Sequence, residues 1–163
     1  MKNLIGNILF ASFFLCVFSA GAQQGLSIDT IFSEYGRQKG SVLINLGKDV
    51  LAGNTKIERY KCLMTDVPPE VENRIAESVR RDFHREEQAG NTFMLKEIRQ
   101  DGMVKTLYFA FGVQNPTAER EYILYNVKDG KITLIYMKGK FPVTDWKDEL
   151  DKLKNLFIKL NNK

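Results

Sequence analysis

The stretch that decides the fold is residues 92–138, TFMLKEIRQDGMVKTLYFAFGVQNPTAEREYILYNVKDGKITLIYMK. It holds four runs rich in β-branched and aromatic residues, at 92–100, 104–113, 119–127 and 131–138, and such runs are typical of strands. Two of the three connections are the pairs Asp101-Gly102 and Asp129-Gly130. Because Asp and Gly tolerate the positive φ of a tight turn, the stretch predicts a four-strand antiparallel meander with two hairpins.

Both faces of this predicted sheet are apolar. A two-residue turn fixes the register of the first hairpin, which predicts Leu95 opposite Tyr108 and Met94 opposite Phe109. In the second hairpin, one face carries Ile123, Tyr125, Val127, Ile132, Leu134 and Tyr136, and the other carries Tyr122, Leu124, Ile135 and Met137. Such a sheet needs cover on both faces or an exposed surface for a ligand. We expect the main core on one face, and the first helix with loops on the other.

The sequence before residue 92 predicts two helices and two strands. Ser27 or Asp29 caps a first helix through Tyr35, and a strand at 41–46 follows it. A strand at 57–64 alternates and turns Cys62 inward. Pro68-Pro69 opens a helix to about residue 88, with a Glu77–Arg81 ion pair and an apolar stripe of Val71, Ile75, Val79 and Phe83.

A last helix follows Thr144, which is its expected N-cap. Its apolar stripe is Trp146, Leu150, Leu153, Phe157 and Leu160. Docking of this stripe on the sheet is one explanation, and a two-helix seam in a homodimer is the second, because the spacing also suits a coiled coil.

The order of elements predicts an α+β fold: a mostly antiparallel sheet with a C-terminal four-strand meander, packed by about three helices. No repeat or Pro/Gly-rich linker divides residues 23–163, which are expected to form a single domain. The net charge of +4 over 163 residues mixes acids and bases, so it points to neither nucleic acid nor an anionic membrane as a partner.

The first 22 residues have the pattern of a removable signal peptide. A basic start at Lys2 precedes an apolar run, and the small residues 20–22 then suit a signal peptidase. We predict cleavage between Ala22 and Gln23, and no stable membrane span after the signal is removed. Cys16 lacks the context of a lipoprotein signal, and Cys62 alone cannot form an intramolecular disulfide.

The sequence carries little of the chemistry that enzymes use. His84, the single histidine, lies on a charged helix face, and Cys62 lies in an apolar strand pattern. One His and one such Cys are too few for a zinc site, and no nucleotide fingerprint is present, so we expect no catalytic residue, metal or cofactor. The remaining acid/base candidates, expected on helix surfaces or in the first turns of helices, are Glu86, Glu87, Asp145, Asp148 and Glu149.

Tyrosines of the meander are the ligand-binding candidates. Tyr108, Tyr125 and Tyr136 each combine an apolar ring with a polar hydroxyl on a predicted sheet face. The connection at 114–118 leaves the position of Tyr108 relative to the other two open.

Several short motifs resemble a family known only as a domain of unknown function. They are Tyr35-Gly36, Lys39-Gly40-Ser41-Val42, Lys48-Asp49-Val50-Leu51, Ile57 with Tyr60-Lys61, and the four-strand block. The family consists of small exported proteins of Bacteroides-like bacteria, many of them lipoproteins, and Cys16 departs from that lipoprotein pattern. The resemblance implies a compartment and a fold but assigns no reaction.

The leading functional prediction is therefore a non-enzymatic domain, exported to the periplasm or cell surface, that binds an envelope protein or a small ligand. The alternatives are a hydrolase or lyase that uses carboxylates and Tyr, and a structural subunit of an envelope assembly. An enzyme needs acids and Tyr converging in one pocket, whereas an assembly subunit needs an exposed apolar patch and stable oligomers.

Overall fold

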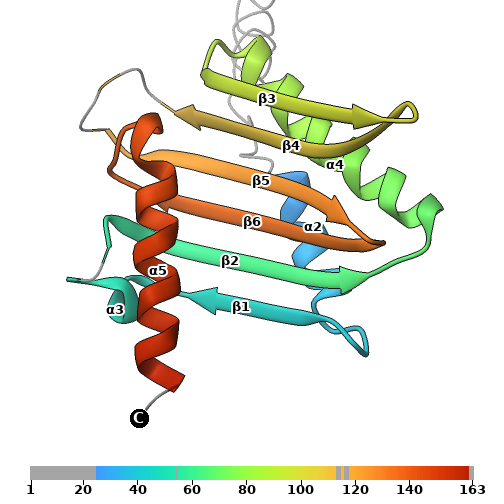
Figure 1. Cartoon of the computed structure of the whole chain (residues 1–163). Helices are drawn as coiled ribbons and strands as arrows, with labels where there is room; N and C mark the ends of the chain where they lie inside the picture. The colour runs from blue at the N-terminus through green and yellow to red at the C-terminus, as the bar shows by residue number, and fades with distance from the viewer. Residues whose placement is uncertain (1–24, 54, 113–114, 116–117, 162–163) are drawn as a thin grey trace, which may run out of the picture.

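Six strands form one antiparallel sheet in the order β1-β2-β6-β5-β4-β3 (Figure 1). They are β1 (Val42–Leu46), β2 (Ile57–Asp66), β3 (Thr92–Gln100), β4 (Met103–Gly112), β5 (Arg120–Lys128) and β6 (Lys131–Gly139). This computed structural model describes residues 25–53, 55–112, 115 and 118–161, so the expected signal and its Ala22–Gln23 cleavage site lie outside the described residues. The predicted α+β fold and the C-terminal meander β3 to β6 are confirmed.

The two Asp-Gly turns form where the sequence places them. Asp101 and Asp129 have φ angles of 52° and 53°, and the glycine after each is also in the left-handed region. Positive φ at both central positions gives the turn a twist that matches the flanking strands. The β5–β6 register then runs without a break from Lys128–Lys131 to Arg120–Gly139.

The first hairpin departs from its predicted register by one residue. Arg99 pairs with Val104 but Ile98 pairs with Thr106, so Lys105 is an extra residue on β4. This bulge pairs Leu95 with Phe109 and Met94 with Ala110, and the predicted pairs Leu95–Tyr108 and Met94–Phe109 are wrong. Lys105, the extra residue of the bulge, also makes a long-range contact. Its ammonium donates to the buried carboxylate of Glu72 at 2.7 Å.

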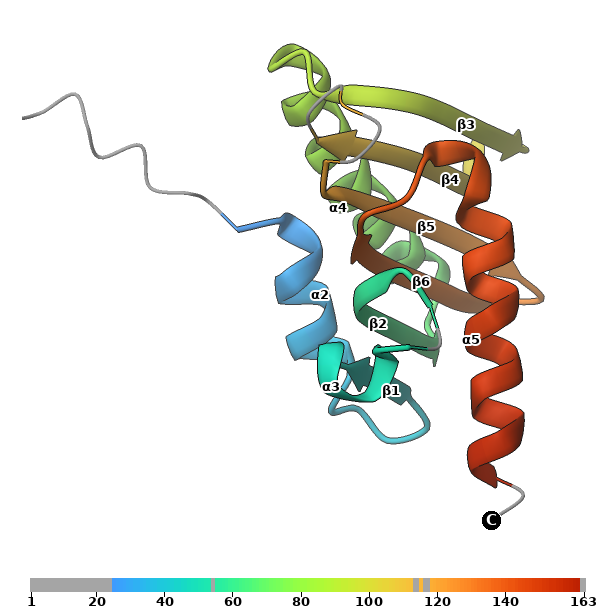
Figure 2. The same ribbon diagram turned by 90° about the vertical axis from the view of Figure 1, so that its left-hand side faces the viewer.

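Helices cover both faces of the sheet (Figures 1 and 2). On one face lie α2 (Ser27–Tyr35) and α4 (Pro69–Gln88), and on the other lie the short α3 (Lys48–Leu51) and α5 (Trp146–Asn161). The prediction that the first helix and loops cover the second face was wrong, because α2 packs beside α4 and the last helix covers that face instead. The docking of the last helix on the sheet is confirmed.

Two apolar clusters fill the space between helices and sheet. The first joins α2 and α4 to Leu63, Leu107, Phe109, Ile123, Tyr125, Ile132, Leu134 and Tyr136. The second joins α3 and α5 to Tyr60, Cys62, Tyr108, Ala110, Tyr122, Ile135 and Met137. The division of β5 and β6 between two apolar faces follows the prediction.

Helix ends are stabilised by contacts distant in sequence. Neither Ser27 nor Asp29 caps α2; its first backbone N–H groups, of Ser27 and Ile28, donate to the carboxylate of Asp82 on α4 at 2.8 and 3.1 Å. Thr144 lies inside a 3-10 turn, Val143–Asp145, and makes no cap. The predicted Glu77–Arg81 pair is also replaced, because Glu77 pairs with Arg80 at 3.5 Å.

Candidate functional site: a polar groove between α2 and α4

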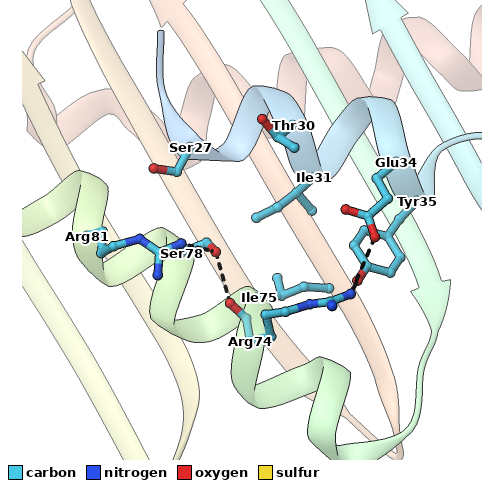
Figure 3. Close-up of a pocket in the computed structure, with 9 residues that line it drawn as sticks. All are labelled: Ser27, Thr30, Ile31, Glu34, Tyr35, Arg74, Ile75, Ser78 and Arg81. Atoms are coloured by element: carbon cyan, nitrogen blue, oxygen red, sulfur yellow. Dashed lines mark hydrogen bonds and ion pairs between the residues drawn. The ribbon is translucent and has the colours of Figure 1, made fainter. Parts of the chain in front are cut away.

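A hollow of about 360 Å³ lies between α2 and α4 on the outer side of the first cluster (Figure 3). Its volume falls within the range of small-molecule sites. The lining residues are Ser27, Thr30, Ile31, Glu34 and Tyr35 from α2, and Arg74, Ile75, Ser78 and Arg81 from α4. We call this hollow the α2–α4 groove.

The base of the groove is apolar and buried. Ile31 and Ile75 are 5% and 1% exposed and belong to the first cluster. Around them stand the hydroxyls of Ser27, Thr30, Tyr35 and Ser78, which both donate and accept hydrogen bonds. An apolar base with a few convergent polar groups is the usual make-up of a binding site.

The first of two guanidinium groups in the groove is already paired. Arg74 donates to the hydroxyl of Tyr35 and to the carboxylate of Glu34, the latter at 3.4 Å. Figure 3 shows this side chain lying along α4 toward the end of α2. Arg74 and Glu34 therefore neutralise one another at that end of the groove.

Among the residues that the structure describes, the second guanidinium has only a neutral partner. Arg81 donates to the hydroxyl of Ser78 at 2.7 Å, and Ser78 in turn donates to the backbone carbonyl of Arg74. Within the described chain, no carboxylate pairs with Arg81. Two arginines and one glutamate line the groove, so its side chains carry an excess of one positive charge.

The N-terminus of α2 does not contribute an anion site to the groove. Its leading N–H groups are occupied by Asp82, which is 1% exposed and also lies 3.8 Å from Arg85. The positive end of the helix is thus already compensated by a fixed carboxylate. Any anion in the groove would depend on the arginines and hydroxyls.

The structure separates the three predicted ligand-binding tyrosines. Tyr108 belongs to the second cluster, whereas Tyr125 and Tyr136 belong to the first, so the sheet lies between them. They are 2%, 0% and 7% exposed, and burial raises the pKa of each phenol. Tyr125 donates to the carbonyl of Glu72 and Tyr136 to the carboxylate of Glu121. None of the three lines the α2–α4 groove, and their ligand binding stays a prediction.

His84 and Cys62, the histidine and cysteine considered for catalysis, are an exposed and a buried side chain. His84 is exposed and lies 3.3 Å from Glu87, while Cys62 is buried and burial raises the pKa of its thiol. A raised pKa keeps the thiol protonated and unreactive. Across the described residues, no three His, Cys, Asp or Glu side chains are grouped so that they could hold a metal ion.

One of the acidic candidates is not on the surface. Glu149 is 1% exposed and accepts hydrogen bonds from Thr55, the backbone N–H of Lys56 and Lys152, each at 2.7 Å. It lies in the first turn of α5, one of the two places expected for these acids, and it ties α5 to the segment before β2. Glu86 and Asp145 pair with Arg85 and Lys56, at 3.2 and 3.7 Å.

Sequence reasoning did not find the arginines of the groove. Arg74 and Arg81 are seven residues apart on α4, about 10 Å along the helix at 1.5 Å per residue. That spacing places both on one side of the helix, but so many charges crowd this helix that the pair does not stand out. The packing of α2 against α4 is what turns that side into a groove.

No helix in the described part of the chain has the length and apolar content to cross a membrane.

Fold and groove together define a class: an α+β protein with a helix-covered antiparallel sheet and a polar groove between two helices on one face. The chain belongs to the family of unknown function DUF6108, whose model matches residues 15–150. No curated protein matches the sequence.

A distant likeness to a solved structure was also found. It is the solution structure of the cyanobacterial PsbP protein CyanoP from Synechocystis sp. PCC 6803, at 11% identity and a TM-score of 0.24. The match covers 76% of this chain and 80% of that one. At this level of similarity it supports no functional inference.

Proposed function

We propose that this protein is an exported, non-enzymatic binding domain, formed by residues 23–163, and that it binds a small anionic ligand in the α2–α4 groove. The single observation that carries the proposal is Arg81, a guanidinium that lines a concave site and whose one hydrogen-bond partner among the described residues is a neutral hydroxyl. Guanidinium groups bind carboxylate and phosphate oxygens in a bidentate way. The ligand would place its anionic group on Arg81 and its apolar part over Ile31 and Ile75.

The described acids favour binding over catalysis. Glu149, Glu72 and Asp82 are the buried carboxylates, and each is held by donors from a distant element. Glu34, the acid of the groove, is paired with Arg74. A hydrolase or lyase would instead be expected to direct an acid and a Tyr toward one pocket with perturbed titration.

Export rests on the sequence of the first 22 residues and on the resemblance to exported proteins of Bacteroides-like bacteria. The test is expression of the full chain, with its own leader, in a Gram-negative host. Intact mass and N-terminal sequencing of the exported product should give a chain that begins at Gln23. A product that retains Met1 would contradict the proposed signal.

Binding is tested by calorimetric titration with small carboxylates, phosphates and sulfates. We expect a saturable signal for at least one anion, and Arg81→Gln should weaken it by about tenfold or more, equivalent to about 1.4 kcal/mol. Binding should also weaken as salt rises.

The matched control is Arg80→Gln. Arg80 is the adjacent residue on α4 but lies outside the groove and pairs with Glu77 and Glu97. Equal losses for the two variants, or no binding of any anion by the wild type, would contradict the proposal.

A further inference from the structure

The two ends of the α2–α4 groove differ in chemistry, because α2 and α4 run in opposite directions. At one end the backbone N–H of Ser27 donates to Asp82, and at the other end Arg74 donates to Glu34 at 3.4 Å. Figure 3 shows Arg81 at the Ser27 end. A ligand that lies along the groove therefore meets a guanidinium whose described partner is neutral at one end, and an ion pair at the other.

The Arg74–Glu34 pair favours a neutral hydroxyl of the ligand. Glu34 would repel a second anionic group, and Arg74 would repel an ammonium group. A carboxylate only accepts hydrogen bonds and a guanidinium only donates them, whereas a hydroxyl does both. One hydroxyl can therefore accept from Arg74 and donate to Glu34. Their side chains are 63% and 50% exposed, so a ligand can reach both.

Two hydroxyls of α2 are available along the groove. Ser27 and Thr30 line it, and their side-chain oxygens have no hydrogen-bond partner in the part of the chain that the structure describes. Thr30 follows Ser27 by three residues and Glu34 follows Thr30 by four, a spacing that places all three along one side of the helix. Because hydroxyls both donate and accept, this row complements a ligand with several hydroxyls of its own.

The apolar part of the groove is small. Of its lining residues, only Ile31, Ile75 and the ring of Tyr35 are apolar, and all three residues are at most 5% exposed. A long alkyl tail would extend past them onto polar side chains. A sugar ring has C–H groups on its faces and hydroxyls at its edge, so it can contact the isoleucines and the surrounding polar groups together.

The charge of the groove favours a single carboxylate on the ligand. Two arginines and one glutamate line the groove and leave an excess of one positive charge, which one carboxylate neutralises. A phosphate monoester carries about −1.5 to −2 at pH 7 and would leave the site negative. Arg81 is the guanidinium that can hold a carboxylate in a bidentate way without first giving up a described acidic partner.

We propose that the ligand of the α2–α4 groove is a sugar acid, a monosaccharide that carries one carboxylate. This inference rests on the proposed function of the groove in binding small anions. The carboxylate of the ligand binds Arg81, and its hydroxyls bind the free hydroxyls of α2 and the Arg74–Glu34 pair. A C–H face of its ring packs on the two isoleucines at the base.

The test is NMR titration of the isotope-labelled full chain, expressed with its leader and purified, with glucuronate and galacturonate as probes. Cyclohexanecarboxylate is the first matched ligand, because it has a ring and a carboxylate but no hydroxyls. Glucose 6-phosphate is the second, because it has the ring and the hydroxyls but carries close to two negative charges at about pH 8. At least one hexuronate should bind about tenfold more tightly than either matched ligand.

A variant of Thr30 tests the contribution of the hydroxyls. Thr30→Val keeps the shape of the side chain and should weaken hexuronate binding by about fivefold, while it leaves binding of cyclohexanecarboxylate unchanged. Thr30→Ser keeps the hydroxyl and should bind like the wild type. The matched control is Ser33→Ala, an exposed hydroxyl of the same helix that lies outside the groove and donates to the carbonyl of Asp29. Circular dichroism confirms that the variants fold.

The outcomes separate this inference from the function on which it rests. If Arg81→Gln weakens every anion but cyclohexanecarboxylate binds as tightly as the hexuronates, the groove is an anion site and the sugar acid is overturned. Tighter binding of glucose 6-phosphate, or equal effects of Thr30→Val and Ser33→Ala on hexuronate binding, would also overturn it. If no anion binds, or if Arg81→Gln leaves binding unchanged, the proposed function itself fails and this inference fails with it.

Discussion

Tyr108 carries a buried hydroxyl that no donor or acceptor among the described residues reaches. Its ring stacks on Trp146 at 4.5 Å, so the side chain is well packed although its polar atom is not satisfied. A buried hydroxyl without a partner costs about 1–3 kcal/mol. Tyr122, on the same face of the sheet, is the contrasting case, because its hydroxyl donates to the carbonyl of Phe141 at 2.5 Å.

At this scale we predict that Tyr108→Phe raises the free energy of unfolding by about 1 kcal/mol, since it removes only the unsatisfied hydroxyl. Tyr122→Phe is the control and should lower it by about the same amount. Urea unfolding followed by circular dichroism measures both. A loss of stability in Tyr108→Phe would mean that the hydroxyl has a water or ligand partner, which would support the predicted ligand binding by Tyr108.

Elements far apart in the sequence are joined by single buried acids. Asp82 holds α2 to α4, Glu72 holds β4 to α4, and Glu149 holds α5 to the segment before β2. Burial alone would raise the pKa of Glu149, but the hydrogen bonds from Lys152, Thr55 and Lys56 together lower it. The charged form is therefore the one that stabilises the attachment of α5.

Because the pKa of Glu149 is lower in the folded state, its contribution to stability is complete above the unfolded-state pKa, about 4.3. This contribution is lost as the pH falls through the folded-state pKa. We predict that Glu149→Gln lowers the free energy of unfolding by about 2–4 kcal/mol at pH 7. The difference from wild type should shrink below about pH 4. Urea titrations at both pH values measure it.

Glu70→Gln, in the exposed first turn of α4, is the control for that experiment and should change stability by less than about 1 kcal/mol. A difference for Glu149→Gln that stays constant down to pH 3 would mean that its carboxylate does not carry the attachment.

At the level of elements, the sequence predicts those features that depend on interactions between residues close together in the chain. Asp-Gly turns and alternating runs are local, and they predicted strands β4, β5 and β6 and the residues on each face of β5 and β6. The bulge at Lys105 and the Asp82 cap depend on α4 packing against distant segments, which no local pattern encodes. The groove was missed for the same reason, since Arg81 becomes part of a site only when α2 packs beside α4.

The whole molecule has two clusters that share a single sheet. Strands β2, β4, β5 and β6 each contribute buried side chains to both clusters. Because both clusters pack on the same strands, the loss of one cluster would expose one face of the sheet on which the other cluster still packs. The fold should therefore behave as one cooperative unit.

We predict that Trp146 fluorescence and far-UV circular dichroism give the same urea midpoint. Trp146 is the single tryptophan and reports on the α5 face, whereas circular dichroism reports on all elements. A Trp146→Phe, Phe83→Trp double variant moves the probe to the other face and should again match circular dichroism. A fluorescence transition at lower urea than the dichroism transition would show that α5 undocks independently.

The Asp82 cap also bears on the order in which the chain is made. The carboxylate that completes α2 lies 55 residues after Ser27, so ribosomes finish α2 well before its cap exists. A nine-residue helix is too short to persist alone in water. Residues 27–35 therefore stay unfolded until α4 has been synthesised. Under the proposed export, this delay would keep the segment that follows the signal in the extended state that passage through a secretion channel requires.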